Sequence, residues 1–141
     1  MEHTVFVFGT LKEGFPNFAV NRGKRLPGDY RTSERYPFYL VGERHVPWLM
    51  QEPGTGHQIS GQVFRVNDEA LAAMDRLERI GEADGYVRVL LQVQAIEVAA
   101  GPTLSAFCYL KPPHQLDRSL VRQGPLGEYT LEHAALYRPR G

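Results

Sequence analysis

The chain has 141 residues, of which 43% are hydrophobic, and its 16 basic and 16 acidic side chains give a formal net charge of zero. This length and composition predict a single domain over residues 1–141, with enough apolar side chains for a core. The balanced charge, the lack of a Lys/Arg-rich run and the lack of an apolar run of ~20 residues argue against nucleic acid and membranes as partners.

The cysteine and histidine content points to a reduced, metal-free protein. Cys108 is the only cysteine, so no internal disulfide can form, which is typical of a reducing compartment. The first residues contain neither a charged region nor a long apolar region, so no signal peptide is expected. The five histidines have no metal-ligand spacing. We therefore expect a soluble, cytoplasmic protein without a metal site.

The first predicted element is a strand over residues 5–8, where four consecutive apolar residues indicate burial on both faces. The strand ends in Gly9-Thr10-Leu11, whose backbone N–H groups can form a nest for an anion or an oxyanion. A plain turn is the simpler interpretation. A loop follows over residues 13–17, then a short helix within residues 18–26 and the start of a strand within residues 29–36.

The middle of the chain predicts a hairpin, a strand and a helix. Strands over residues 38–41 and 46–50 form the hairpin, in which Pro47 indicates an edge or a bulge. The strand over residues 59–66 contains Gly61, which indicates a bend or a close backbone approach. Asn67 or Asp68 then caps a helix that ends near Arg79.

The last part of the chain predicts two further strands, over residues 86–98 and 104–110, then mostly loop with a short helix over residues 130–137. Strands outnumber helices and do not alternate with them. This order predicts an α+β class, with a small mixed or antiparallel β-barrel and flanking helices.

One residue of the predicted helix does not fit its surroundings. At ~100° per residue, Ala70, Leu71, Met74 and Leu77 form an apolar arc, and Glu78 lies about 20° from Leu71 on the same face. A carboxyl on a buried face has a raised pKa, as general acid–base catalysis needs. Two structural alternatives remain: Glu78 swings to solvent at the frayed helix end, or it pairs with Arg76, Arg88 or a tyrosine.

Other candidate groups favour structural roles. Cys108 lies between two aromatic residues of a strand and is expected to be an inert core thiol. His114, Asp117 and Ser119 share one proline-rich loop, which indicates a surface loop and not a catalytic triad. Trp48 and Tyr86 are candidates for a pocket wall or for core packing.

The opening Val7-Phe8-Gly9-Thr10-Leu11-Lys12 resembles the Val-Tyr-Gly-Thr-Leu-Lys motif of the gamma-glutamylcyclotransferase-like family. The segment Met74-Asp75-Arg76-Leu77-Glu78, followed by Tyr86-Val87-Arg88, is similar to the family's Leu-Asp-x-x-Glu…Tyr-x-Arg signature. The resemblance covers nearly the whole chain. The Pro47-Trp48 hairpin and the Tyr137-Arg138-Pro139 tail are most similar to the gamma-glutamylamine cyclotransferase branch.

The resemblance implies a small β-barrel with a pocket at the end of the first strand, and a reaction that needs no cofactor. In that reaction the α-amine of a small gamma-glutamyl substrate attacks its own side-chain amide and releases 5-oxoproline and a free amine. Glu78 matches the catalytic glutamate, as both base and acid. The expected substrate-binding residues are Phe8, Gly9, Thr10, Leu11, Trp48, Tyr86 and Tyr109.

Two features depart from the family pattern. Phe8 replaces the tyrosine that usually precedes the glycine, so a hydroxyl is lost, and Tyr86, Tyr109 or a water are candidates to supply one. The loop over residues 79–85 looks longer than in the most similar branch, which puts the leaving amine in question.

Two other functions stay open on the sequence. One is a non-catalytic module that binds gamma-glutamyl compounds, and the other is a related cyclising or amide-cleaving enzyme for a specialised metabolite. The leaving amine and the oligomeric state are open as well.

Overall fold

The computed structural model describes residues 1–97 and 101–140. Its strands are β1 (Glu2–Val7), β2 (Lys24–Arg25), β3 (Tyr30–Tyr36), β4 (Phe38–Val41), β5 (Val46–Leu49), β6 (His57–Asn67), β7 (Val87–Ala95), β8 (Thr103–Leu110) and β9 (Val121–Gln123). Its helices are α1 (Asp68–Leu77), α2 (Leu131–Ala134) and the 3₁₀ turns η1 (Phe18–Val20), η2 (Pro113–Gln115) and η3 (Arg118–Leu120). No described helix is long and apolar enough to span a membrane.

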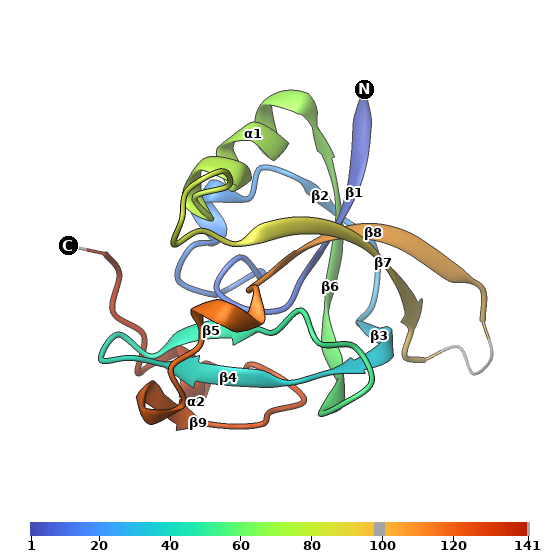
Figure 1. Cartoon of the computed structure of the whole chain (residues 1–141). Helices are drawn as coiled ribbons and strands as arrows, with labels where there is room; N and C mark the ends of the chain where they lie inside the picture. Colours follow the sequence, from blue (N-terminus) through green and yellow to red (C-terminus); the bar gives the residue numbers. More distant parts are fainter. Residues whose placement is uncertain (98–100, 141) are drawn as a thin grey trace.

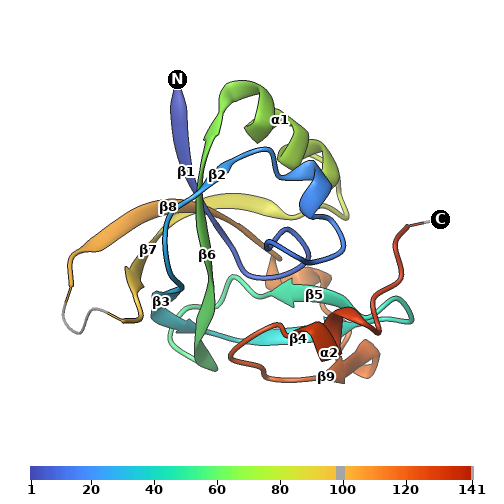
Figure 2. The same cartoon turned by 180° about the vertical axis from the view of Figure 1, so that it is seen from behind.

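The larger sheet has the strand order β1-β8-β7-β3-β6-β2, and β1 also pairs with β6. This additional pairing closes β1, β8, β7, β3 and β6 into a ring (Figures 1 and 2). The β1–β8 pairing is parallel, whereas β1–β6, β3–β6, β3–β7 and β7–β8 are antiparallel. The predicted α+β class with a mixed, barrel-like sheet is therefore confirmed.

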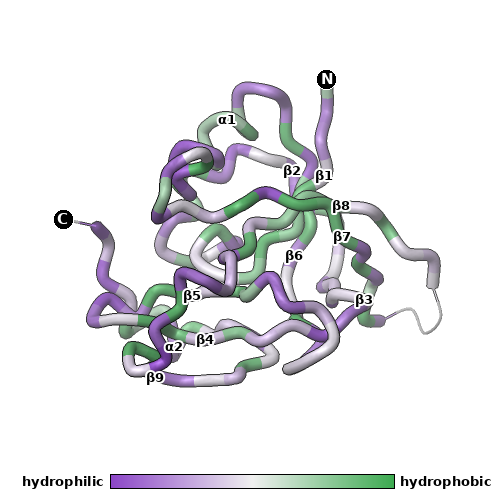
Figure 3. Tube along the Cα trace, in the orientation of Figure 1, coloured by the Kyte–Doolittle hydropathy of each residue, from purple (hydrophilic) through white to green (hydrophobic). Residues whose placement is uncertain are grey.

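The predicted burial of β1 on both faces is confirmed. Phe6 and Phe8 belong to the apolar cluster inside the ring, and Val5 and Val7 belong to the cluster beneath α1. Apolar segments accordingly gather where β1, β6 and β8 meet (Figure 3). The first strand thus packs against both the ring interior and helix α1. Residues of both clusters at the end of β1 line the cavity described below.

Gly61 of β6 faces β1 closely, as predicted. A Cβ at this position would lie 2.4 Å from the carbonyl oxygen of Val7, so only glycine allows the two strands to pack at this distance. The antiparallel register then pairs Val7 with Gln62, which fixes where β1 ends relative to β6.

A second, three-stranded sheet with the order β5-β4-β9 lies across one end of the ring. Pro47 lies in β5, an edge strand of this sheet, as its missing N–H requires. An isolated bridge between Met50 and Lys111 links the hairpin to the end of β8. The hydroxyl of Tyr86, after the loop that follows α1, donates to the carbonyl of Pro47 and so connects this loop to the hairpin.

Several predicted elements need correction. The helix predicted within residues 18–26 is only the single turn η1, and the chain then continues as the short strand β2. Strand β9 was not expected, because two of its three residues are polar and it pairs with β4 only through a long-range contact. Strand β7 ends at Ala95, and the last residue of the prediction, Val98, lies outside the described residues. Helix α1 ends at Leu77, so Glu78 is its C-cap.

Candidate active site

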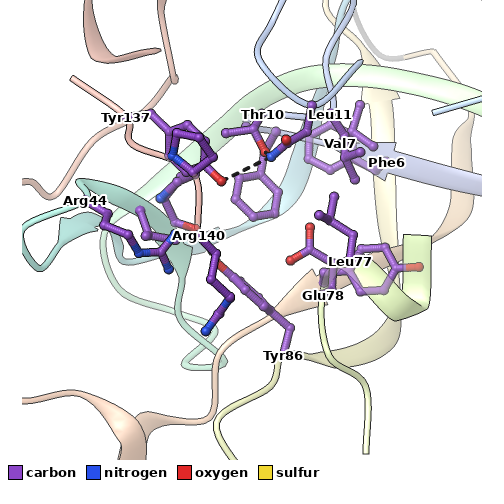
Figure 4. Close-up of a pocket in the computed structure, with 17 residues that line it drawn as sticks. Phe6, Val7, Thr10, Leu11, Arg44, Leu77, Glu78, Tyr86, Tyr137 and Arg140 are labelled. Carbon is purple, nitrogen blue, oxygen red and sulfur yellow. Dashed lines mark hydrogen bonds between the residues drawn. The ribbon is translucent and has the colours of Figure 1, made fainter. Parts of the chain in front are cut away.

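A cavity of about 210 Å³ lies at the end of β1 (Figure 4). Its walls come from β1 and the turn after it, the end of α1, the β4–β5 hairpin and the carboxyl-terminal tail. The lining residues that carry polar groups or belong to the predicted site are Phe8, Gly9, Thr10, Leu11, Asn17, Arg44, Glu78, Tyr86, Tyr109, Tyr137 and Arg140.

The end of helix α1 fixes the position of Glu78. Arg79 adopts the left-handed conformation, with φ +57°, and its N–H donates to the carbonyl of Arg76. The N–H of Ile80 donates to the carbonyl of Asp75, which completes the hydrogen-bond pattern of a Schellman motif. Glu78 is therefore held in a formed helix end. The frayed alternative is wrong, and the carboxylate points into the cavity (Figure 4).

The carboxylate of Glu78 is buried and largely removed from water. Within the described chain it forms no hydrogen bond or ion pair, and Arg88, one of the three alternative partners, bonds to Asp75 instead, at 2.5 Å. Burial raises the pKa of Glu78 to about 7, and the nearby positive charge of Lys111 opposes this rise. A carboxyl with this pKa exchanges protons readily near neutral pH.

The turn after β1 supplies hydrogen-bond donors to the same cavity. Residues 8–12 are buried, and the N–H groups of Gly9, Thr10 and Leu11 donate no hydrogen bond to another described residue. Buried backbone donors almost always have a partner, so three consecutive free ones in residues that line a cavity indicate a site for an anionic oxygen. Asn17 supports the turn, because its side chain donates to Thr10 Oγ1 at 2.9 Å.

Two tyrosines of the predicted site are held by hydrogen bonds to the protein. Tyr86 donates to the carbonyl of Pro47 at 2.7 Å, and Tyr109 donates to Asp75 at 2.6 Å. Burial raises the pKa of the Tyr86 hydroxyl well above its ordinary value, so it stays protonated. Neither hydroxyl is free to replace the one missing at Phe8, and both shape the wall instead.

Trp48 does not line this cavity, whereas the other predicted site residues do. It lines an adjoining cavity, where its ring packs against Lys111. The ammonium of this lysine lies 4.3 Å from the ring centroid of Trp48 and 4.6 Å from that of Tyr86. It donates to the carbonyl of Asp84 and the side chain of Gln115. Burial lowers the pKa of Lys111 to about 8.

The carboxyl-terminal tail adds residues that were not among the predicted site residues. Tyr137 and Arg140 line the cavity, and the Tyr137 hydroxyl accepts from the Asn17 side chain at 3.3 Å (Figure 4). The tail is pinned to the hairpin, since the N–H of Arg138 donates to the carbonyl of Arg44 at 3.0 Å. The Tyr137-Arg138-Pro139 motif was the only available signal for this segment, and it did not reveal the contact.

The remaining candidates have structural roles. Cys108 is fully buried, and burial raises the pKa of its thiol, in agreement with an inert core residue. Asp117 accepts from the backbone and side chain of Ser119 in an exposed turn. That geometry is a local turn and not a triad.

Comparison with known proteins identifies the family of this chain. The family model described as gamma-glutamyl cyclotransferase, AIG2-like, matches residues 5–131. The chain belongs to this family. Membership places it among cyclotransferase enzymes and confirms the resemblance carried by the opening strand and the helix motif.

Individual members of the AIG2-like family are similar over most of their length. The chain is 35% identical to gamma-glutamylaminecyclotransferase of Rattus norvegicus, over 75% of this chain and 74% of the rat protein. It is 38% identical to the Bos taurus protein of the same name, over 96% and 82% respectively. A crystal structure of an AIG2-like protein from Mus musculus superposes with a TM-score of 0.81 at 31% identity, over 99% of this chain and 97% of the mouse chain.

Proposed function

We propose that this protein is a cyclotransferase that converts gamma-glutamyl amines into 5-oxoproline and a free amine, with Glu78 as its general acid–base group. The observation that carries the proposal is the pairing of an unpartnered carboxyl with free backbone N–H groups across one cavity. The names of the rat and bovine relatives support the substrate class.

The reaction joins the α-nitrogen of the glutamyl group to its own side-chain carbonyl carbon. Glu78 takes a proton from the α-ammonium, and the neutral amine attacks the carbonyl, whose π electron pair moves to oxygen. The N–H groups of Gly9, Thr10 and Leu11 lie where they can donate to the substrate carboxylate or to this oxyanion. Removing one such donor in other enzymes costs ~10²–10³ in turnover.

Collapse of the intermediate breaks the bond to the leaving nitrogen, which keeps the electron pair. The two protons that the α-nitrogen loses end on the leaving nitrogen, so the amine departs as an ammonium ion. One carboxyl can relay both protons in turn, because a pKa of about 7 populates both of its forms at neutral pH. The nucleophile and the electrophile belong to one molecule. The enzyme therefore lowers the barrier by binding the conformer in which the α-amine lies next to the side-chain carbonyl.

The test is the substitution Glu78→Gln, which keeps the side-chain size and removes the proton relay. We expect 5-oxoproline release from gamma-glutamyl amides to fall by about two to four orders of magnitude. Glu82→Gln is the matched control, because Glu82 lies exposed in the following loop. Unchanged release in the Glu78 variant would contradict the assignment. Tight binding of gamma-glutamyl amides without any turnover by the native protein would favour a binding module.

A further inference from the structure

Lys12 is a buried cation that the proposed reaction does not use. It is the last residue of the turn after β1 (residues 9–12, the donor turn), where its N–H donates to the carbonyl of Gly9 at 3.1 Å. Only 4% of Lys12 is exposed, and it does not line the candidate active site. It lines a separate cavity of about 470 Å³, together with residues of β6 and of the segment over residues 128–132. The Lys12 ammonium therefore does not contact a substrate bound beside Glu78.

The ammonium of Lys12 is held by contacts with two other segments. It donates to the carbonyl of Tyr129 at 2.5 Å, and it lies 4.3 Å from the ring centroid of Phe15. Burial lowers the pKa of Lys12, and the nearby carboxylates of Glu128 and Asp29 oppose this change. A buried ammonium without such partners is unfavourable, so its contacts tie the donor turn to the segment around Tyr129.

The segment after Tyr129 continues into the candidate active site. The Tyr129 ring is fully buried and stacks on His133, with 5.9 Å between the ring centroids. His133 accepts from the N–H of Thr130 at 3.0 Å in the capping box of helix α2. The N–H of Tyr137 donates to the carbonyl of Ala134 at 3.1 Å. Because these contacts are all local, residues 129–137 form a compact unit, and the position of Tyr129 determines where Tyr137 meets the cavity.

A second connection joins the donor turn to the same unit. The Asn17 side chain donates to Thr10 Oγ1 at 2.9 Å and to the Tyr137 hydroxyl at 3.3 Å. The donor turn and residues 129–137 are thus joined twice, once at Lys12 and once at Asn17. The connection at Lys12 is nearly completely buried and has a charged donor, and hydrogen bonds to charged groups are the stronger kind.

We propose that Lys12 is a positioning residue, whose ammonium holds the donor turn and the Tyr137 hydroxyl in one fixed arrangement around the substrate. This inference rests on the proposed function. The N–H groups of Gly9, Thr10 and Leu11 stabilise an anionic oxygen only when they converge on its position. A displacement of ~1 Å in such groups can cost about 10²-fold in rate. Lys12 acts through these groups and does not touch the reacting atoms.

Rescue by a small ammonium ion tests this role. Lys12→Ala removes a group of the size of n-propylammonium, and we expect kcat/KM for gamma-glutamyl n-butylamide to fall about 10²-fold. The cavity that Lys12 lines also has the exposed Glu128 and Glu132 in its walls, so the vacated space is open to solvent. Added n-propylammonium should therefore restore activity saturably, by about tenfold, the effect of one hydrogen bond from a charged donor. The neutral n-propanol should not restore it.

The controls separate this effect from others. Lys24→Ala makes the same substitution at an exposed position of β2 and should keep native activity. In the native protein n-propylammonium should not raise the rate. If n-propanol restores activity as well as n-propylammonium does, or if neither restores it, the proposed role of the Lys12 ammonium is wrong.

Hydrogen exchange of a milder variant, Lys12→Met, decides the question without turnover. The N–H of Asn17 bonds to the carbonyl of Thr10, and the N–H of Arg138 bonds to the carbonyl of Arg44, so they report on the donor turn and on the tail. We expect both to exchange about tenfold faster in the variant, with the N–H of Ile80 unchanged. Unchanged exchange at Asn17 and Arg138, or equal acceleration at Ile80, overturns the proposal. If the native protein releases no 5-oxoproline from any amide, the proposed function fails, whereas the exchange rates still decide whether Lys12 holds the turn and the tail.

Discussion

At the scale of single residues, the proposed chemistry depends on two largely buried ionisable groups, Glu78 and Lys111. Burial favours the neutral forms of Glu78 and Lys111, which raises the pKa of the acid to about 7 and lowers that of the base to about 8. Each charge also favours the charged form of the other. The working pKa of Glu78 is therefore a balance between desolvation and the charge of Lys111.

Removing the charge of Lys111 tests this balance. In Lys111→Met, the pKa of Glu78 rises further, so less of it is ionised at a given pH. We expect the acidic limb of the kcat/KM profile to move to higher pH and activity at pH 6.5 to fall several-fold. Lys111→Arg keeps the charge and keeps the limb near its native position. A methionine variant with a native acidic limb would show that Lys111 does not act on Glu78.

The hydroxyl of Tyr137 is a second single-residue test. It accepts a hydrogen bond from Asn17, so its own hydrogen is free to be donated to a ligand in the cavity. Phe8 has no hydroxyl that could make such a contact. In Tyr137→Phe we expect kcat/KM to fall about tenfold, the value of one hydrogen bond of ~1.4 kcal/mol. Tyr30→Phe, on β3, serves as the control. Equal losses in the two variants would point to a general effect on packing.

At the scale of elements, the carboxyl end of α1 and the loop over residues 79–85 hold the carboxyl of Glu78. The N–H of Tyr86 donates to the carbonyl of Glu78 at 3.0 Å and closes this loop. Asp75 accepts from Tyr109 and Arg88, which attaches the helix to β8 and β7. The position of Glu78 is thus fixed by the Asp75 contacts in the helix before it and by the Tyr86 contact in the loop after it.

Gly85 is the position at which this loop is most sensitive. A Cβ on Gly85 would lie 1.8 Å from the carbonyl oxygen of Arg79, so the loop must shift in Gly85→Ala. We expect a loss of ~2 kcal/mol or more in the free energy of unfolding, together with lower activity. Gly127→Ala is the matched control, because its Cβ would make only ordinary contacts, at 3.7 Å. Urea unfolding measures both, and a stable, fully active Gly85→Ala would contradict the role given to the loop.

At the scale of the whole molecule, local sequence patterns predicted the part of the candidate site formed by β1 and α1. They did not predict the part formed by Lys111 and the carboxyl-terminal tail. The apolar run of β1 and the place of Glu78 on the helix are visible in periodicity, because each depends on a single element. Lys111 carries no local signal, and the Tyr137-Arg138-Pro139 motif did not place Tyr137 in the site. They reach the site only because the Met50–Lys111 bridge and the tail–hairpin contact bring distant segments together. Strand β9 was missed for the same reason, since its order depends on pairing with β4.

The same pair of buried groups makes the stability of the whole protein depend on pH. The pKa of Glu78 is about 7 in the folded protein and ordinarily 4.5, so between these values the folded state binds more protons than the unfolded state. The free energy of unfolding therefore falls as pH rises from 4.5 to 7, by on the order of 3 kcal/mol from this group. Lys111 has the opposite effect at higher pH, because its lowered pKa stabilises the folded state as pH rises above about 8.

Glu78→Gln removes the first of these contributions, because glutamine does not titrate. We expect the variant to gain on the order of 2–3 kcal/mol of stability relative to the native protein between pH 4.5 and pH 7.5, although it loses activity. Urea unfolding of both proteins at pH 4.5, 6 and 7.5 measures the difference, with Glu82→Gln as a control that should follow the native curve. A difference that stays constant with pH would mean that Glu78 titrates in the folded protein as it does in the unfolded chain. In that case the cavity would not hold the acid–base group that the proposed cyclisation requires.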